Sequence, residues 1–202
     1  MNTREKRKKV RRALVLAARE AFRKKGFSKT TMDDIARAAG KAKSTLYYYF
    51  DSKEAAFQAV VHLEGETLKN RLLEVIRDPH RNPKQKLEDY VLIRWQGFEA
   101  LGNAFQTMRQ EFLQKSHLVE KYRKQYDELE MELIGTILRE GIEKKTFRIA
   151  PEAVETVSLT IVLGMKALEI PFFASGQYSH TDSKIKNLLD MLFYGIVQTE
   201  VV

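Results

Sequence analysis

Apolar side chains recur at spacings of three and four residues through almost the whole chain, which is the period of an amphipathic helix. We find no convincing pair of alternating segments that would indicate β-strands. Only four prolines occur in 202 residues, and three of them (Pro79, Pro83 and Pro151) lie at breaks in the apolar pattern. The sequence therefore predicts an all-α protein of about nine helices.

Helix boundaries follow from glycines, prolines and capping residues. Gly26 ends the first helix, whose apolar face runs from Val10 to Phe22, and Thr31 with Asp34 resembles a capping box that opens the second. We expect further helices at 43–49, 53–77, 84–101, 104–115, 118–143, 151–170 and 183–198. Loops are expected at 79–83 and 171–181, with a short link at 144–148.

Positive charge is concentrated in the first quarter of the chain. The net charge is +8, but residues 1–50 carry 15 Lys and Arg against 4 Asp and Glu, whereas residues 51–202 are net negative. This asymmetry favours a polyanion-binding end joined to a body with another role. The segment Arg4 to Arg12 is interpreted either as a solvated tail or as an arm that adds nonspecific attraction.

Several classes of function are disfavoured by composition and motifs. The chain has no cysteine, so disulfides and thiolate metal sites are excluded, and a reducing cytoplasm fits. Neither a secretory signal nor an apolar run of about 20 residues is present, so we expect no membrane association. No catalytic or nucleotide-binding motif occurs. The four histidines lack metal-ligand spacing, and we predict no enzyme, no cofactor and no metal.

Two short helices meet at Gly40 within about twenty residues, which is the spacing of a helix-turn-helix unit. Such short helices are marginal alone and need a shared core. That small core would consist of Ile35, Ala36, Ala39, Leu46 and Phe50. In such a unit the second helix enters the major groove of DNA. A generic helical hairpin in a bundle is the alternative that spacing alone leaves open.

Specific residues carry a family resemblance. The segments are Gly26-Phe27, Thr30 to Gly40, Ser44 to Phe50, and Ser52 to Glu54. Together they strongly resemble the DNA-binding domain of TetR-family transcriptional regulators over about residues 10–60. The rest of the chain matches only in length and helical pattern. The resemblance implies a three-helix DNA-binding head at 1–55 and a helical effector-binding and dimerisation body at 56–202.

The resemblance also implies which residues contact DNA: Thr31, Lys43, Ser44, Thr45, Tyr47, Tyr48 and Lys53. Among them Lys43, Ser44 and Thr45 would face base edges, and the others would reach phosphates. Two positions depart from the family pattern. Lys41 replaces a small apolar residue, and its ammonium group can reach a phosphate. Ala42 replaces a capping residue, which costs about 0.5–2 kcal/mol.

The body is interpreted as a pocket and a dimer interface. Because TetR-family proteins usually bind a ligand between the middle helices, an apolar or aromatic effector is expected near Trp95, Phe98, Phe105, Met108, Phe112 and Tyr126. Plain core packing is the alternative for each of them. The last two helices present apolar stripes that imply a homodimer seam at Val157, Ile161, Gly164, Leu168, Leu188, Leu192, Phe193 and Ile196. A monomer with a buried penultimate helix is the other possibility.

These observations predict a ligand-responsive regulator, most simply a repressor that a small effector releases from a palindromic operator on double-stranded DNA. One alternative is an architectural or division-control DNA-binding dimer of the same fold that has no effector. A more remote one is a helical enzyme with a DNA-binding head.

Overall fold

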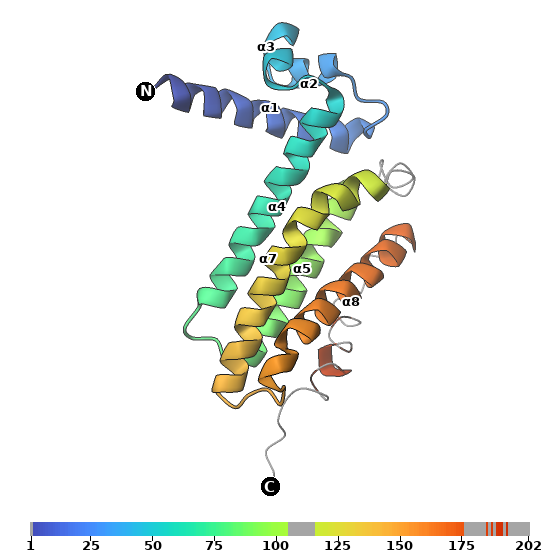
Figure 1. Ribbon diagram of the computed structural model, residues 1–202. Helices are drawn as coiled ribbons and strands as arrows, with labels where there is room; N and C mark the ends of the chain where they lie inside the picture. Colours follow the sequence, from blue (N-terminus) through green and yellow to red (C-terminus); the bar gives the residue numbers. More distant parts are fainter. Residues whose placement is uncertain are drawn as a thin grey trace. The chain divides into compact units, whose positions relative to one another are not determined.

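The computed structural model describes residues 2–104 and 116–175, together with residues 185, 187, 189–191 and 193. Within these ranges the chain forms α-helices and one 3₁₀ turn but no strand, so the all-α prediction is confirmed. The elements are α1 Thr3–Lys25, α2 Met32–Ala38, α3 Lys43–Tyr49, α4 Lys53–Arg77, α5 Pro83–Ala104, α7 Ser116–Glu143, η2 Pro151–Ala153 and α8 Val154–Ser175 (Figure 1). None of the described helices is long and apolar enough to cross a membrane.

Capping explains where the early helices begin. Asn2 and Glu5 form a capping box, so α1 begins at Thr3 and includes the basic segment for which the tail interpretation had been left open. Thr31 and Asp34 form the second box and start α2 as predicted. Ala42 precedes α3 without a side-chain cap, which also agrees with the sequence.

Two later boundaries differ from the prediction. α5 continues through Gly102 and Asn103 to Ala104, because these residues weaken a helix by only about 1 kcal/mol each and do not break it. α8 continues through Pro171 to Ser175, where a loop was expected. Proline has a helix-compatible φ and removes a single backbone hydrogen bond, so a helix can pass through it at a cost of about 3 kcal/mol.

The described chain divides into two compact units, and the first consists of residues 1–67 and 101–122. Its core is built from α1, α2, α3 and the first part of α4, with Leu14, Ile35 and Leu46 fully buried. Phe22 and Phe27 pack against Phe57, with ring centroids 5.3–5.6 Å apart. This aromatic cluster fixes the end of α1 against α4.

The second unit consists of residues 68–100 and 123–202. The parts of α5, α7 and α8 in this unit run alongside one another (Figure 1). Its buried core includes Leu72, Leu87, Ile134, Leu138, Val162 and Phe193. One ion pair lies inside it, since the Arg94 Nε of α5 donates to Glu130 of α7 at 2.7 Å and both side chains are buried.

Candidate nucleic-acid interface

The turn between α2 and α3 holds α3 in a fixed orientation. Gly40 has φ 60°, a left-handed conformation that glycine adopts without strain, and the Lys41 amide donates to the Ala36 carbonyl at 3.0 Å. On the other side of the turn, Leu46 and Phe50 are buried in the core of the first unit. The predicted core role of Phe50 is thereby confirmed, and the opposite face of α3 points away from that core.

That outward face consists of Lys43, Ser44, Tyr47 and Tyr48, all exposed. At 3.6 residues per turn they occupy an arc of roughly 140°. The exposed fractions of Tyr47 and Tyr48 are 43% and 64%, which is high for aromatic side chains. The arrangement offers an ammonium group, a hydroxyl and two phenols on one side of a short helix.

Two other predicted contact residues, Lys41 and Thr45, flank this face. Lys41 is exposed in the turn, whereas Thr45 is half-buried at the edge of the face. Lys43 donates a hydrogen bond to Asp33 of α2 at 3.1 Å, and this bond raises the pKa of the Lys43 ammonium. Binding of Lys43 to a base edge would therefore have to displace Asp33.

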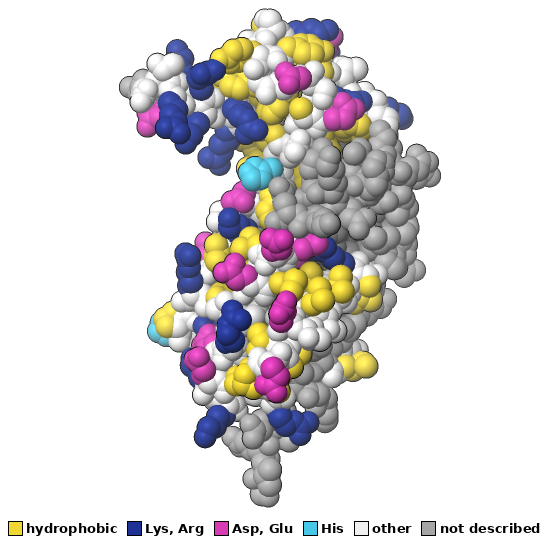
Figure 2. Space-filling view, in the orientation of Figure 1, with side chains coloured by type: hydrophobic (Ala, Val, Ile, Leu, Met, Phe, Trp, Pro, Cys, Tyr) yellow, Lys and Arg dark blue, Asp and Glu magenta, His cyan; other side chains and the backbone are white. Residues whose placement is uncertain are grey.

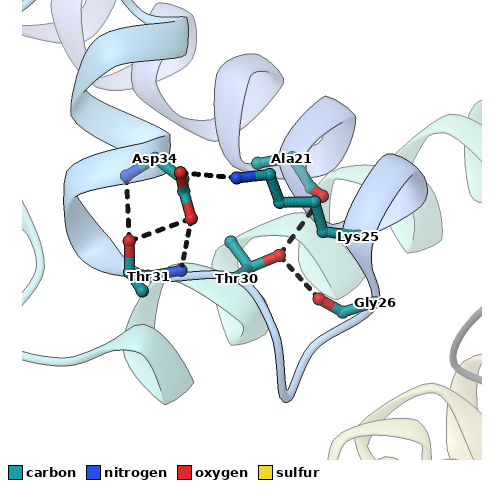
Figure 3. Close-up of polar contacts among 6 residues, drawn as sticks. All are labelled: Ala21, Lys25, Gly26, Thr30, Thr31 and Asp34. Carbon is teal, nitrogen blue, oxygen red and sulfur yellow. Dashed lines mark hydrogen bonds and ion pairs between the residues drawn. The ribbon is translucent and has the colours of Figure 1, made fainter.

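The start of α2 is a dense hydrogen-bond cluster (Figure 3). The Thr31 hydroxyl donates to Asp34 at 2.9 Å and accepts from the Asp34 amide, while the Thr31 amide also donates to Asp34. Lys25 donates to the same carboxylate at 2.6 Å. A phosphate contact through the Thr31 hydroxyl would have to replace one of these bonds.

Thr30 has a structural role that sequence reasoning did not separate from the motif. Its hydroxyl is buried and lies 2.6 Å from the Gly26 carbonyl oxygen and 3.2 Å from that of Ala21 (Figure 3). It therefore satisfies carbonyls at the end of α1 that the helix itself leaves open. The sequence did contain a signal for this role, because Thr30 directly precedes Thr31, the residue that caps α2.

Lys53 lies at the first turn of α4, where its ammonium group donates to the carbonyl oxygens of Phe27 at 2.8 Å and Ser28 at 3.3 Å. The same group lies 4.5 Å from the centroid of the Phe27 ring. Sequence reasoning assigned Lys53 to a phosphate. In the structure it joins α4 to the turn that follows α1.

Arg7 and Arg11 of α1 approach the region of α3 and were not singled out from the sequence. Arg7 donates to the Tyr48 hydroxyl and lies 5.3 Å from the centroid of that ring. Arg11 lies 5.4 Å from the centroid of the Phe50 ring. Figure 2 shows Lys and Arg side chains gathered over this end of α1.

The predicted effector and dimer residues fall in different places. Trp95 is buried in the second core, and Tyr126 of α7 is half-buried. Ile161 and Phe193 are buried in that core too, so they do not form an outward seam in this unit, while Val157 and Leu168 are half-buried and Gly164 is exposed. The other predicted residues lie outside the described part: Phe105, Met108, Phe112, Leu188, Leu192, Ile196 and the side chain of Phe98.

Residues 14–60, which contain α2, α3 and the core that supports them, match the family described as bacterial regulatory proteins, tetR family. The matched segment, less than a quarter of the 202 residues, is therefore a TetR-type DNA-binding head. The TetR family is one of DNA-binding transcriptional regulators and not a class of enzymes, as the sequence predicted. The head contains every predicted DNA-contact residue.

Known regulators resemble this chain over the head or over a larger part of its length. The transcriptional repressor BepR of Brucella suis biovar 1 (strain 1330) is 29% identical over 83 residues, which are 41% of this chain and only 40% of BepR. A putative fatty acid metabolism regulator of Clostridium perfringens is 26% identical, with a TM-score of 0.63 over 93% of this chain and 100% of that one. A transcriptional regulator of Cytophaga hutchinsonii ATCC 33406 is 24% identical, with a TM-score of 0.74 over 92% and 97%. The chain thus shares the fold of these two regulators well beyond the head.

Proposed function

We propose that this protein is a homodimeric repressor that binds a near-palindromic operator through α3 and leaves it when a small molecule binds the body. The observation that carries this proposal is the outward face of α3, whose polar and phenolic side chains stand on a helix fixed by Leu46 and Phe50. Hydroxyl, ammonium and phenol groups at such a position suit base edges and phosphates. BepR, which this chain resembles over 83 residues, is a transcriptional repressor, and this supports repression as the direction of regulation.

Mutation of the outward face tests the DNA-binding role. Tyr47→Ala and Ser44→Ala should weaken binding to a selected operator by at least about tenfold in combination, because each good contact contributes about 1 kcal/mol or more. Gln58→Ala, an exposed change on α4, is the control. Gel-shift titration gives the affinities. Equal affinities of the wild type, the Ser44→Ala/Tyr47→Ala double variant and the Gln58→Ala control would exclude α3 as the helix that recognises DNA bases.

The homodimer is supported by α8. Its outward face carries small and apolar side chains at Thr156, Leu159, Thr160, Leu163 and Ala167, all exposed. Their spacings of three and four residues make one stripe along the helix. Leu159 and Leu163 are 41% and 53% exposed, and such leucines in a line favour packing against a second helix.

Leu163→Glu tests the seam, since burying an unpaired carboxylate between two subunits costs several kcal/mol. It should convert a dimer into a monomer in sedimentation experiments and weaken operator binding. Gln58→Glu adds the same charge on α4 and should leave the dimer intact. A wild-type chain that sediments as a monomer at micromolar concentration would refute this part of the proposal.

The most specific part of the proposal is that the effector is apolar or aromatic. Two observations support it: the middle helices are rich in apolar and aromatic residues, and the similar C. perfringens protein is described as a putative fatty acid metabolism regulator. In this proposal residues 1–55 bind DNA and residues 56–202 bind effector and partner, in the cytoplasm where the operator lies. Fatty acids and aromatic compounds should raise the melting temperature and release DNA. If no compound does either, the effector-free regulator becomes the better account.

A further inference from the structure

One face of α1 is apolar in the second half of the helix and basic in the first half. Leu14, Ala18 and Phe22 are fully buried in the core of the first unit and lie on one side of the helix. Continued towards the N-terminus at the same spacing of three and four residues, this stripe passes through Arg11, Arg7 and Arg4. The side of α1 that faces the core in its second half is therefore arginine-rich in its first half.

Contacts agree with this direction. Arg7 hydrogen-bonds the Tyr48 hydroxyl, and Arg11 lies over the Phe50 ring, so both arginines point to the side where α3 lies. The helix that carries them is held from its first residue by the Asn2 and Glu5 capping box. The arginines are thus presented by ordered backbone beside the exposed Tyr48.

The basic residues of the two halves of α1 also differ in how they are neutralised. In the second half, Arg19 pairs with Glu64, Arg23 with Glu20, and Lys25 with Asp34, at 2.6–3.3 Å. Arg4, Arg7 and Arg11 are exposed, and none has a carboxylate partner among the described residues. Three unneutralised guanidinium groups on one face form a site for an anionic partner, because each can hold a phosphate through two parallel hydrogen bonds.

Duplex DNA fits this face better than an anionic membrane does. A helix that binds a lipid surface needs an apolar face, and residues 3–12 contain only one large apolar side chain, Val10. If α3 enters the major groove of DNA, by contrast, the phosphates of the backbone that borders this groove would lie next to these arginines.

We propose that the first three turns of α1 are a second DNA-contact element, in which Arg4, Arg7 and Arg11 bind the phosphates that flank the groove read by α3. Arg7 also positions the Tyr48 phenol for its own contact. The inference rests on the proposed DNA-binding function. The sequence alone indicated only a nonspecific attraction between this basic segment and DNA; the inference names the residues and the helix face that make the contact.

Two matched double variants test the face. Arg4→Gln/Arg7→Gln removes two charges from it, and Lys6→Gln/Lys9→Gln removes two charges from the opposite side of the same turns. Binding to a fluorescent 30-base-pair random duplex would be measured by anisotropy at four salt concentrations, with helicity checked by circular dichroism. The arginine pair should lower the slope of log affinity against log salt by about two, and the lysine pair by less than about half a unit.

Equal losses of slope in the two pairs, or no loss in either, would overturn the proposed face. Arginine substitutions that weaken binding to phosphatidylserine vesicles but leave binding to the duplex unchanged would also overturn it. A wild type that binds no duplex at all would instead refute the proposed function, so the two failures are distinguishable.

A double-mutant cycle between Arg7→Gln and Tyr48→Phe tests the positioning role. If Arg7 positions Tyr48, the combined loss of affinity should be smaller than the product of the two single losses by about threefold or more. Strictly multiplicative losses would show that Arg7 does not act through Tyr48.

Discussion

The Lys53 ammonium group lies 2.8 Å from the carbonyl oxygen of Phe27, and it also lies over the ring of that residue. Through these contacts the first turn of α4 is fastened to the turn that follows α1. The family resemblance assigns this lysine to a phosphate. The geometry adds a role in folding that can be measured without DNA.

Lys53→Ala should lower the free energy of unfolding by about 1–2 kcal/mol, because two backbone carbonyls lose a charged donor. Lys43→Ala is the control, since Lys43 is exposed and its ion pair with the exposed Asp33 is screened by solvent and adds little to stability. Urea unfolding measures both. Equal free energies of unfolding for the two variants would show that Lys53 does not stabilise the fold.

Acid should destabilise the first unit through Asp34. The hydrogen bond from Lys25, followed by those from the Thr31 amide and hydroxyl, holds the pKa of Asp34 well below its ordinary value. A carboxylate with a lowered pKa in the folded state stabilises the fold fully above its unfolded pKa of about 3.9, and this contribution is lost as the pH falls further.

Asp34→Asn removes that carboxylate, so the variant should be less stable at pH 7 and lose less stability than the wild type between about pH 4 and pH 2. Thermal unfolding across this range measures the difference, with Asp51→Asn as the control for a lost surface charge. An Asp34→Asn protein with the full acid sensitivity of the wild type would contradict the assignment.

The buried pair of Arg94 and Glu130 should be costly to break on one side. Arg94→Met leaves a buried carboxylate without its partner and should destabilise the second unit by about 3–5 kcal/mol. Arg94→Met/Glu130→Leu replaces both charges by apolar groups and should recover most of this loss. Denaturant unfolding distinguishes the cases, and a double variant at least as unstable as the single one would contradict the argument.

Two helical glycines offer a matched comparison. A methyl group at Gly141 of α7 would overlap the buried Phe147 ring, so Gly141→Ala should cost about 1–3 kcal/mol. At Gly164 of α8 nothing in the described chain lies within 4 Å of the added carbon, and Gly164→Ala should gain up to about 1 kcal/mol from helix propensity. Melting temperatures that move the same way would refute this difference in packing.

Local signals in the sequence predicted the head well. Glycines, a capping box and apolar spacing located α2 and α3, because the groups that decide such short helices lie within a few residues of each other. Contacts between distant residues were not predictable from these signals. Arg7 meets Tyr48 across 41 positions and Lys53 meets Phe27 across 26, and no pattern of three and four residues encodes either contact.

The body shows the same limit. The apolar stripe of α8 was visible, but which side faces its own core depends on the neighbouring helices. Ile161 was therefore assigned to the seam although it packs inward, and the exposed Leu159 and Leu163 were passed over.

Selection of bound sequences from a random duplex library tests the central claim most directly, since it assumes no operator. The account predicts enrichment of a near-palindromic site whose two halves lie one helical turn apart, about 34–36 Å, or a multiple of it. Ser44→Ala/Tyr47→Ala should abolish that enrichment in a parallel selection. Failure of the wild type to enrich any sequence, or enrichment that survives the loss of both side chains, would contradict the claim that this chain reads DNA through α3.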